Sequence, residues 1–229
     1  MPGPGLPQRG PSGSFEWWFS ALVLAVILGL FAAAVLVEFR PEKLMALFIP
    51  LFWVLLLPLH EAGHAMVARI LGWYVGQVVI GWGKPVARFR WGKTRIEIRA
   101  LPLEGFVRTV PINLSCPRLK SALIYFAGPG AELLLLGILL AAVGPRTLLS
   151  PSPSYPLLAA QSLALAILVS TFINLVPHSV MSASGPIAND GLGILSSFFV
   201  PESHFAEMIR SRDNDNDDRW EEQAADGSG

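Results

Sequence analysis

The stretch that decides the fold is PLHEAGHAMVARIL, residues 58–71, in which HEAGH interrupts an apolar run. No charged residue occurs in residues 44–59, and the whole text is compatible with one helix. Residues four apart share a helix face, so His60 and His64 can bind one metal ion. Glu61 lies about 100° round the helix axis, where it can reach a water on that metal. The pattern predicts a zinc hydrolase site set in a membrane-spanning helix.

The composition of the whole chain supports a polytopic membrane protein. Of its 229 residues, 52% are hydrophobic and 15% are charged, whereas a soluble domain is nearer a quarter charged. Lys plus Arg and Asp plus Glu number 17 each, so the net charge is zero and gives no case for nucleic-acid binding. The single cysteine, Cys116, excludes an internal disulfide framework and a multi-cysteine metal site.

Four stretches are long and apolar enough to cross a bilayer, which takes about 20 residues. They cover about 17–37, 43–71, 121–143 and 156–176. The predicted fold is therefore an α-helical polytopic membrane protein with about four transmembrane helices. Residues 15–200 would form its membrane-embedded domain. Residues 1–14 are rich in Pro, Gly and Ser and are predicted to form a disordered tail. Residues 201–229 are predicted to form a polar tail that is solvated from about Arg210 onward.

The segment between the second and third spans, residues 73–120, holds nine of the seventeen Lys and Arg. The positive-inside rule places this segment in the cytoplasm, together with both termini, and the layout favours a bacterial plasma membrane. Alternating side chains over about 76–110, with a turn at Gly92-Lys93, predict a small membrane-associated antiparallel β segment. Its arginines can bind anionic lipid headgroups, and its edge can hold an extended substrate. The sequence leaves both roles open.

Two histidines leave zinc short of a protein ligand, and candidates follow the fourth span. There an apolar helix ends in NLVP, residues 174–177, and NDG follows at residues 189–191. At this point the chain resembles the site-2 protease family of intramembrane zinc metalloproteases, which pairs HExxH with NxxP and a later Asp-Gly. The resemblance runs over roughly residues 44–200 and includes FAGPGAE, residues 126–132, in the third span.

The resemblance implies a function and a set of site residues. The zinc ligands would be His60, His64 and Asp190, and Glu61 would be the general base. The reaction would be hydrolysis of peptide bonds in or near transmembrane segments of substrate proteins, with Zn²⁺ as cofactor. The partners would be a membrane-protein substrate and the lipid bilayer, and the oligomeric state is left open. Further candidates for contact with substrate or with the zinc ligands are Gly128, Glu132, Asn174 and Pro177.

Two features depart from the family pattern. Asn174 and Asp190 are 16 residues apart (190 − 174), longer than the compact form of the motif, and the insert 178–188 can form a lid. Asp190 can instead cap the helix that follows it, which leaves His178 as a reserve ligand. Glu132 stands where the family more often has Asn or another small or polar residue. It can bind substrate backbone, orient a zinc ligand, or lie beside a water-filled cleft.

The sequence also leaves two other functions open. One is a membrane zincin of another type, with Glu132 as the third zinc ligand. The other is a non-catalytic membrane docking protein that keeps the fold. The intact HEAGH motif argues against the docking protein.

Overall fold

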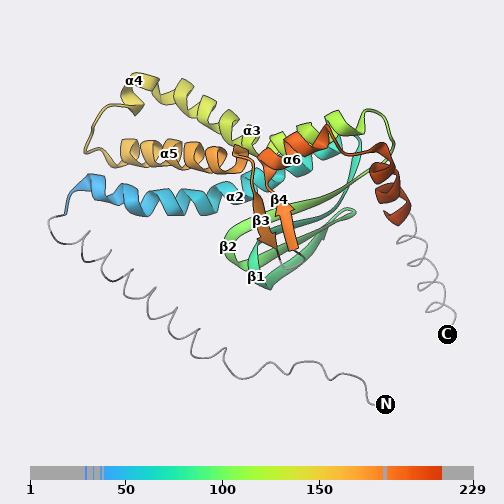
Figure 1. Ribbon diagram of the computed structural model, residues 1–229. Helices are drawn as coiled ribbons and strands as arrows, with labels where there is room; N and C mark the ends of the chain where they lie inside the picture. Colours follow the sequence, from blue (N-terminus) through green and yellow to red (C-terminus); the bar gives the residue numbers. More distant parts are fainter. Residues whose placement is uncertain (1–28, 30–32, 34–36, 38, 183–184, 213–229) are drawn as a thin grey trace, which may run out of the picture.

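The computed structural model describes residues 29, 33, 37, 39–182 and 185–212 (Figure 1). Within that part of the chain, three helices are long and apolar enough to cross a membrane. They are Pro41–Ile70, in which the 3-10 helix η1 (Pro41–Leu44) leads into α2 (Met45–Ile70), then α3 (Pro117–Val143) and α5 (Tyr155–Leu175). Each of the three contacts the other two, and the short helix α4 (Pro145–Leu148) lies between α3 and α5 in the chain.

Three of the four predicted spans, about 43–71, 121–143 and 156–176, correspond to these helices within a few residues. Their length and composition therefore confirm three apolar helices of spanning size. The first predicted span, about 17–37, lies almost entirely outside the described residues, and the predicted tail at 1–14 lies wholly outside them. A fourth span therefore stays a prediction.

The long helices expose apolar side chains and bury polar ones, as expected of helices surrounded by lipid. On α2, Leu51 and Leu55 are exposed, and Leu134 on α3 and Phe172 on α5 are exposed as well. The buried polar side chains of the three helices are His60, Glu61, His64, Glu132, Ser162, Ser170 and Thr171. Because lipid tails offer no hydrogen bonds, these groups must find their partners inside the bundle.

Between α2 and α3 the chain forms a hairpin of two long antiparallel strands, β1 (Trp73–Trp91) and β2 (Thr94–Pro111). Gly92 supplies the positive φ, 61°, at the turn. Residues 77–80 of β1 pair with residues 105–108 of β2 on one side and with residues 95–98 on the other. The hairpin thus doubles back into a small sheet, and the predicted antiparallel segment is confirmed.

The sheet is fixed to the end of α2 that follows the HEAGH motif. Arg69 donates a hydrogen bond from Nη2 to Thr94 Oγ1 (2.7 Å), and Thr94 Oγ1 donates to the Val75 carbonyl (2.6 Å). An apolar cluster joins the same elements to α3 and to a helix at residues 202–212. Its buried members are Ala68, Trp73, Val75, Val78, Ile124 and Phe205. The position of the sheet relative to His60 and His64 is therefore set by both packing and hydrogen bonds.

After α5 the chain forms a short antiparallel hairpin, β3 (Ser179–Ser182) and β4 (Gly185–Ala188), and then α6 (Asp190–Ser197). Residues 202–212 are helical, although the sequence analysis assigns them to a tail. The reason is an apolar face: Phe205 is buried against Trp73, with ring centroids 6.1 Å apart, and Met208 packs one turn later. Residues 213–229 lie outside the described part.

Candidate metal centre

Helix α2 brings His60 and His64 together, as their spacing predicts. Both side chains are buried, and their ring centroids are 4.7 Å apart. Gly63 lies between them and lets α3 approach, because a Cβ at this position would lie 2.5 Å from the Ala127 carbonyl oxygen. The glycine of HEAGH is thus required by the close crossing of α2 and α3.

Asp190 is the first residue of α6, and its carboxylate faces both histidines. Its Oδ2 lies 2.9 Å from His60 Nε2, and its Oδ1 lies 3.4 Å from His64 Nε2. The helix cap is the preceding residue, Asn189, whose Oδ1 accepts a hydrogen bond from Leu192 N at 3.0 Å. The capping role considered for Asp190 is therefore wrong, and its side chain is left to the metal centre.

The long spacing before Asp190 is explained by the β3–β4 hairpin, which closes on itself at its base. Asn189 N donates to the His178 carbonyl (3.1 Å), and His178 N donates to Asn189 Oδ1 (3.0 Å). The Asn189 amide also donates to the Val176 and Asn174 carbonyls, at 2.7 and 3.0 Å. These bonds return the chain to the end of α5, so the insert does not displace Asp190 from the histidines.

The hydrogen bonds of the two imidazoles leave one nitrogen of each ring for a metal. His64 Nδ1 lies 2.6 Å from the Ile124 carbonyl. Because a carbonyl only accepts, Nδ1 carries the proton. His60 Nδ1 lies 3.0 Å from Glu132 Oε1. In both rings Nε2 then presents its lone pair to the Asp190 carboxylate. The nitrogen lone pair and the carboxylate oxygen repel each other at these distances, so a proton or a metal ion must lie between the two atoms.

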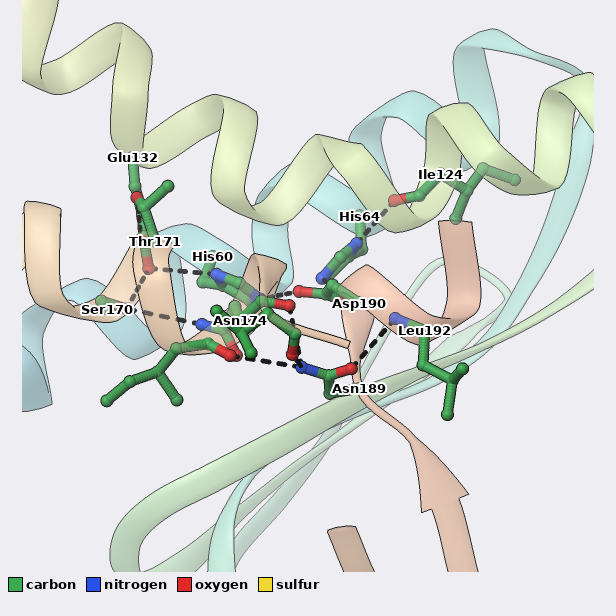
Figure 2. A network of polar contacts seen from close by, with 12 residues as sticks. His60, His64, Ile124, Glu132, Ser170, Thr171, Asn174, Asn189, Asp190 and Leu192 are labelled. Atoms are coloured by element: carbon green, nitrogen blue, oxygen red, sulfur yellow. Dashed lines mark hydrogen bonds and ion pairs between the residues drawn. The ribbon is translucent and has the colours of Figure 1, made fainter. Parts of the chain in front are cut away.

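Glu132 is 1% exposed and lies at the centre of a polar network between α3 and α5 (Figure 2). Ser170 Oγ donates to its Oε1 at 2.9 Å, and Thr171 Oγ1 donates to its Oε2 at 3.1 Å. Glu132 contacts His60 through Nδ1, whereas Asp190 contacts the same ring through Nε2. Glu132 thus lies behind the imidazole, where a carboxylate can orient a metal ligand.

The donor set and the space around it fit zinc. His60, His64 and Asp190 each offer one ligand atom, and these atoms lie within 4.8 Å of one another. Ligands at 2.0–2.2 Å from one tetrahedral zinc ion are about 3.4 Å apart. Gly128 keeps the neighbouring space open, since a Cβ there would lie 2.6 Å from His60 Nε2 and would also collide with His64 Nε2.

Glu61 lies beside the ligand group without belonging to it. It is 4% exposed, and its buried Oε2 has no hydrogen-bond partner among the described residues. Strand β2 passes against it, because a Cβ at Gly105 would lie 2.7 Å from the carboxyl carbon of Glu61. A buried carboxylate oxygen without a partner costs free energy. That cost is compensated if the oxygen binds water or substrate.

Other predicted residues lie near the centre but outside the ligand group. The Asn174 amide donates to Ser170 Oγ at 3.5 Å, and Pro177 is exposed beyond the end of α5. His178 is exposed, and its ring bonds to the Val176 carbonyl and to Asn189.

Sequence reasoning missed three residues that organise the site, namely Ser170, Thr171 and Asn189. The adjacent hydroxyls at 170 and 171 were detectable, since they interrupt an apolar span one turn before Asn174. The Asn before Asp190 was a standard capping signal. The carbonyl that binds His64 has no signal in the sequence, because every residue carries one.

The sequence of this chain is similar to a known protein family and to parts of known proteins. The model of peptidase family M50 matches residues 47–211. Zinc metalloprotease Rip1 of Mycobacterium tuberculosis is 31% identical over 99 residues, which cover 37% of this chain and 24% of that protein. Membrane metalloprotease ARASP of Arabidopsis thaliana, a chloroplastic protein, is 40% identical over 48 residues, 21% of this chain and 11% of that protein. The chain thus spans about a quarter or less of the length of either relative.

Proposed function

The chain belongs to peptidase family M50, the site-2 protease family, and from this premise we propose that it is a zinc-dependent intramembrane endopeptidase. It hydrolyses peptide bonds in or near the transmembrane segments of other proteins. The observation that carries the proposal is the convergence of the ligand atoms of His60, His64 and Asp190 within 4.8 Å. The two histidines lie on a helix of spanning size, and Asp190 lies on α6, beyond the β3–β4 hairpin. The names of the two relatives, a zinc metalloprotease and a membrane metalloprotease, support the same class of reaction.

In the proposed mechanism His60, His64 and Asp190 would hold the zinc ion, a set of three protein ligands of the kind that catalytic zinc sites use. Bound zinc supplies a Lewis acid that polarises a peptide carbonyl and makes water acidic enough to ionise near neutral pH. Glu132 and the Ile124 carbonyl hold the two imidazoles in the required tautomer and orientation. The rings are thereby oriented before substrate arrives, which lowers the cost of organising the site.

Glu61 is the general base and then the general acid of this mechanism. Its carboxylate accepts a proton from the attacking water and delivers that proton to the leaving amine. The unpartnered Oε2 gives the water a hydrogen-bond acceptor. Burial among apolar helices excludes bulk water, which strengthens the interaction between the carboxylate and the reacting groups.

A substrate helix must unwind before it is cut, because its peptide carbonyls are closed off by internal hydrogen bonds. We propose that the unwound segment lies along β2. Residues 105–108 pair with β1 on one side and have no second strand partner among the described residues. Gly105 in this edge lies against Glu61. An extended peptide added to the edge would therefore pass the general base.

The proposed orientation follows the distribution of basic residues. The sheet and the termini lie on the cytoplasmic side, and the helices lie in a plasma membrane of bacterial type. Of the seventeen Lys and Arg, nine fall in residues 73–120, which run from the end of α2 into the first turn of α3. Accessibility of a single thiol label at Lys93→Cys, in a Cys116→Ser background, tests the sidedness in intact cells.

The zinc content of detergent-purified protein tests the proposed site most directly. We expect about one zinc per wild-type chain and loss of zinc in both His64→Ala and Asp190→Ala, since two ligands hold zinc weakly. His178→Ala is the matched control and should retain the metal, because its ring points to Val176 and Asn189. Zinc retained in Asp190→Ala would overturn the assignment of the third ligand.

Glu132→Gln is expected to weaken zinc binding without removing any ligand. Loss of a carboxylate behind a metal-bound histidine typically costs 10–100-fold in metal affinity, so we expect a rise of about that size in the zinc Kd. A competition titration with a chromogenic chelator measures it, with the exposed Glu207→Gln as control. An unchanged Kd would mean that Glu132 serves only packing. Complete loss of zinc in Glu132→Gln, with zinc kept in Asp190→Ala, would favour the other type of zincin.

A further inference from the structure

A second polar feature lies on the sheet and shares no lining residue with the metal centre. It is an open groove of about 660 Å³ between β1, β2 and the helix at residues 202–212. Five of its lining residues are cationic, and none is acidic; the cations are Arg90, Lys93, Arg95, Arg108 and Arg212. We refer to it as the basic groove.

Four of the five cations of the basic groove have no acidic partner among the described residues. The side chains of Arg90, Lys93, Arg95 and Arg108 make no hydrogen bond or ion pair within the described part of the chain. Elsewhere on the same sheet, Glu97 pairs with Arg88 at 3.1 Å and with Arg99 at 2.7 Å. The hydrogen bond from Arg99 holds the pKa of the Glu97 carboxyl below its usual value, so that pair is fully charged. One carboxylate of the sheet is therefore shared by two arginines, whereas the four cations named above line the groove without such a partner in the part of the chain that the structure describes.

The complementary charge follows directly in the chain. Residues 213–222 read DNDNDDRWEE, with six acidic side chains and one basic, a net charge of −5. Arg212, the residue before this acidic segment, lines the groove itself and donates to the Pro111 carbonyl at 3.5 Å. A segment tethered at the wall of its own site has an effective concentration in the millimolar range. A soluble anion of the same charge would have to reach that concentration to compete.

We propose that the acidic segment 213–222 docks in the basic groove through carboxylate pairs with Arg90, Lys93, Arg95 and Arg108. Single exposed ion pairs are weak, but several on one tethered segment add without a new cost of association. Arg108 lies three residues from Gly105, on the strand that borders Glu61. The docked segment therefore occupies the sheet beside the edge proposed for substrate. The docking itself does not depend on the proposed peptidase activity.

A distance measurement between two spin labels tests the docking in the full chain. The labels are placed at Asn216→Cys in the acidic segment and at Thr109→Cys in the groove wall, in a Cys116→Ser background. In neutral phosphatidylcholine nanodiscs at low salt we expect a short, narrow distance distribution. In 1 M salt, where the Debye length is about 3 Å, we expect the short-distance population to be lost. A broad distribution that does not respond to salt would overturn the proposal.

Two charge variants and a control separate docking from general electrostatics. Arg95→Glu with Arg108→Glu should remove the short-distance population, whereas Lys84→Glu, exposed on the same sheet but outside the groove, should keep it. Changing Asp215, Asp217 and Asp218 to Asn should have the same effect as the double groove variant and leaves the sheet untouched. If the short distance is absent while flotation with phosphatidylglycerol vesicles requires Arg95 and Arg108, the groove binds lipid headgroups and the proposal fails.

Discussion

Glu61→Gln is expected to abolish peptide hydrolysis and to leave the zinc content at one per chain. The side chain keeps its size but can no longer accept a proton, and a positioned general base contributes about 10²–10⁴-fold to the rate. Zinc remains because Glu61 is not in the group of His60, His64 and Asp190. The assay is cleavage of reconstituted single-span substrates, with metal content measured on the same preparation.

Glu104→Gln is the matched control for that substitution. Glu104 precedes Gly105 on β2 and is not in the group of possible metal ligands. The substitution Glu104→Gln therefore removes a carboxylate near Glu61 and leaves the metal centre unchanged. Hydrolysis by Glu104→Gln should stay at the wild-type level. Wild-type hydrolysis by Glu61→Gln would remove the general base from the mechanism. An absence of any cellular effect of Glu61→Gln would instead favour the docking protein.

The features that depend on local periodicity could be predicted from the sequence. An apolar run of spanning length must form a helix in lipid, and a helix with HEAGH must present His60 and His64 on one face. The antiparallel β segment was equally readable, because Gly92-Lys93 separates two stretches of strand-forming residues. These predictions needed no knowledge of which elements touch.

The features that depend on contacts between distant segments could not be predicted in detail. The 16-residue spacing to Asp190 leaves both ligation and capping open in the sequence, and the bonds of Asn189 across the base of the β3–β4 hairpin assign the cap to Asn189. The role of Glu132 was open for the same reason. Its position behind His60 follows from the packing of α3 against α2 and α5, which no periodicity encodes.

The C-terminal helix shows how composition can mislead near a chain end. The aspartates after Arg212 predict a solvated tail from about Arg210 onward, and residues 201–229 as a whole are assigned to a polar tail. Phe205 packs against Trp73, and Met208, on the same helix face, packs against the apolar cluster that contains Trp73, so residues 202–212 are held by apolar burial. Two apolar side chains at helical spacing are therefore enough to hold this segment against the domain, although the residues that follow are polar.

Gly128→Ala is expected to remove zinc while the helices remain folded. A Cβ at this position would lie 2.6 Å from His60 Nε2 and closer still to His64 Nε2, on the side of the rings that faces Asp190. Either the methyl group displaces the imidazoles or α3 moves away from α2, and both changes separate the ligand atoms. Overpacking of this kind costs about 1–3 kcal/mol, which lowers the Tm without unfolding a stable bundle.

Gly137→Ala on the same helix is the control for Gly128→Ala, because a Cβ there would meet nothing within 4 Å. An alanine in a helix interior is favoured over glycine by about 0.5–1 kcal/mol, so this variant should keep its zinc and its Tm should not fall. Both are measured by metal content and thermal unfolding. If Gly128→Ala also bound one zinc per chain with unchanged affinity, the Nε2 atoms would not face the ion. The centre would then require a different set of ligand atoms, since a Cβ at residue 128 collides with the Nε2 atoms of both histidines.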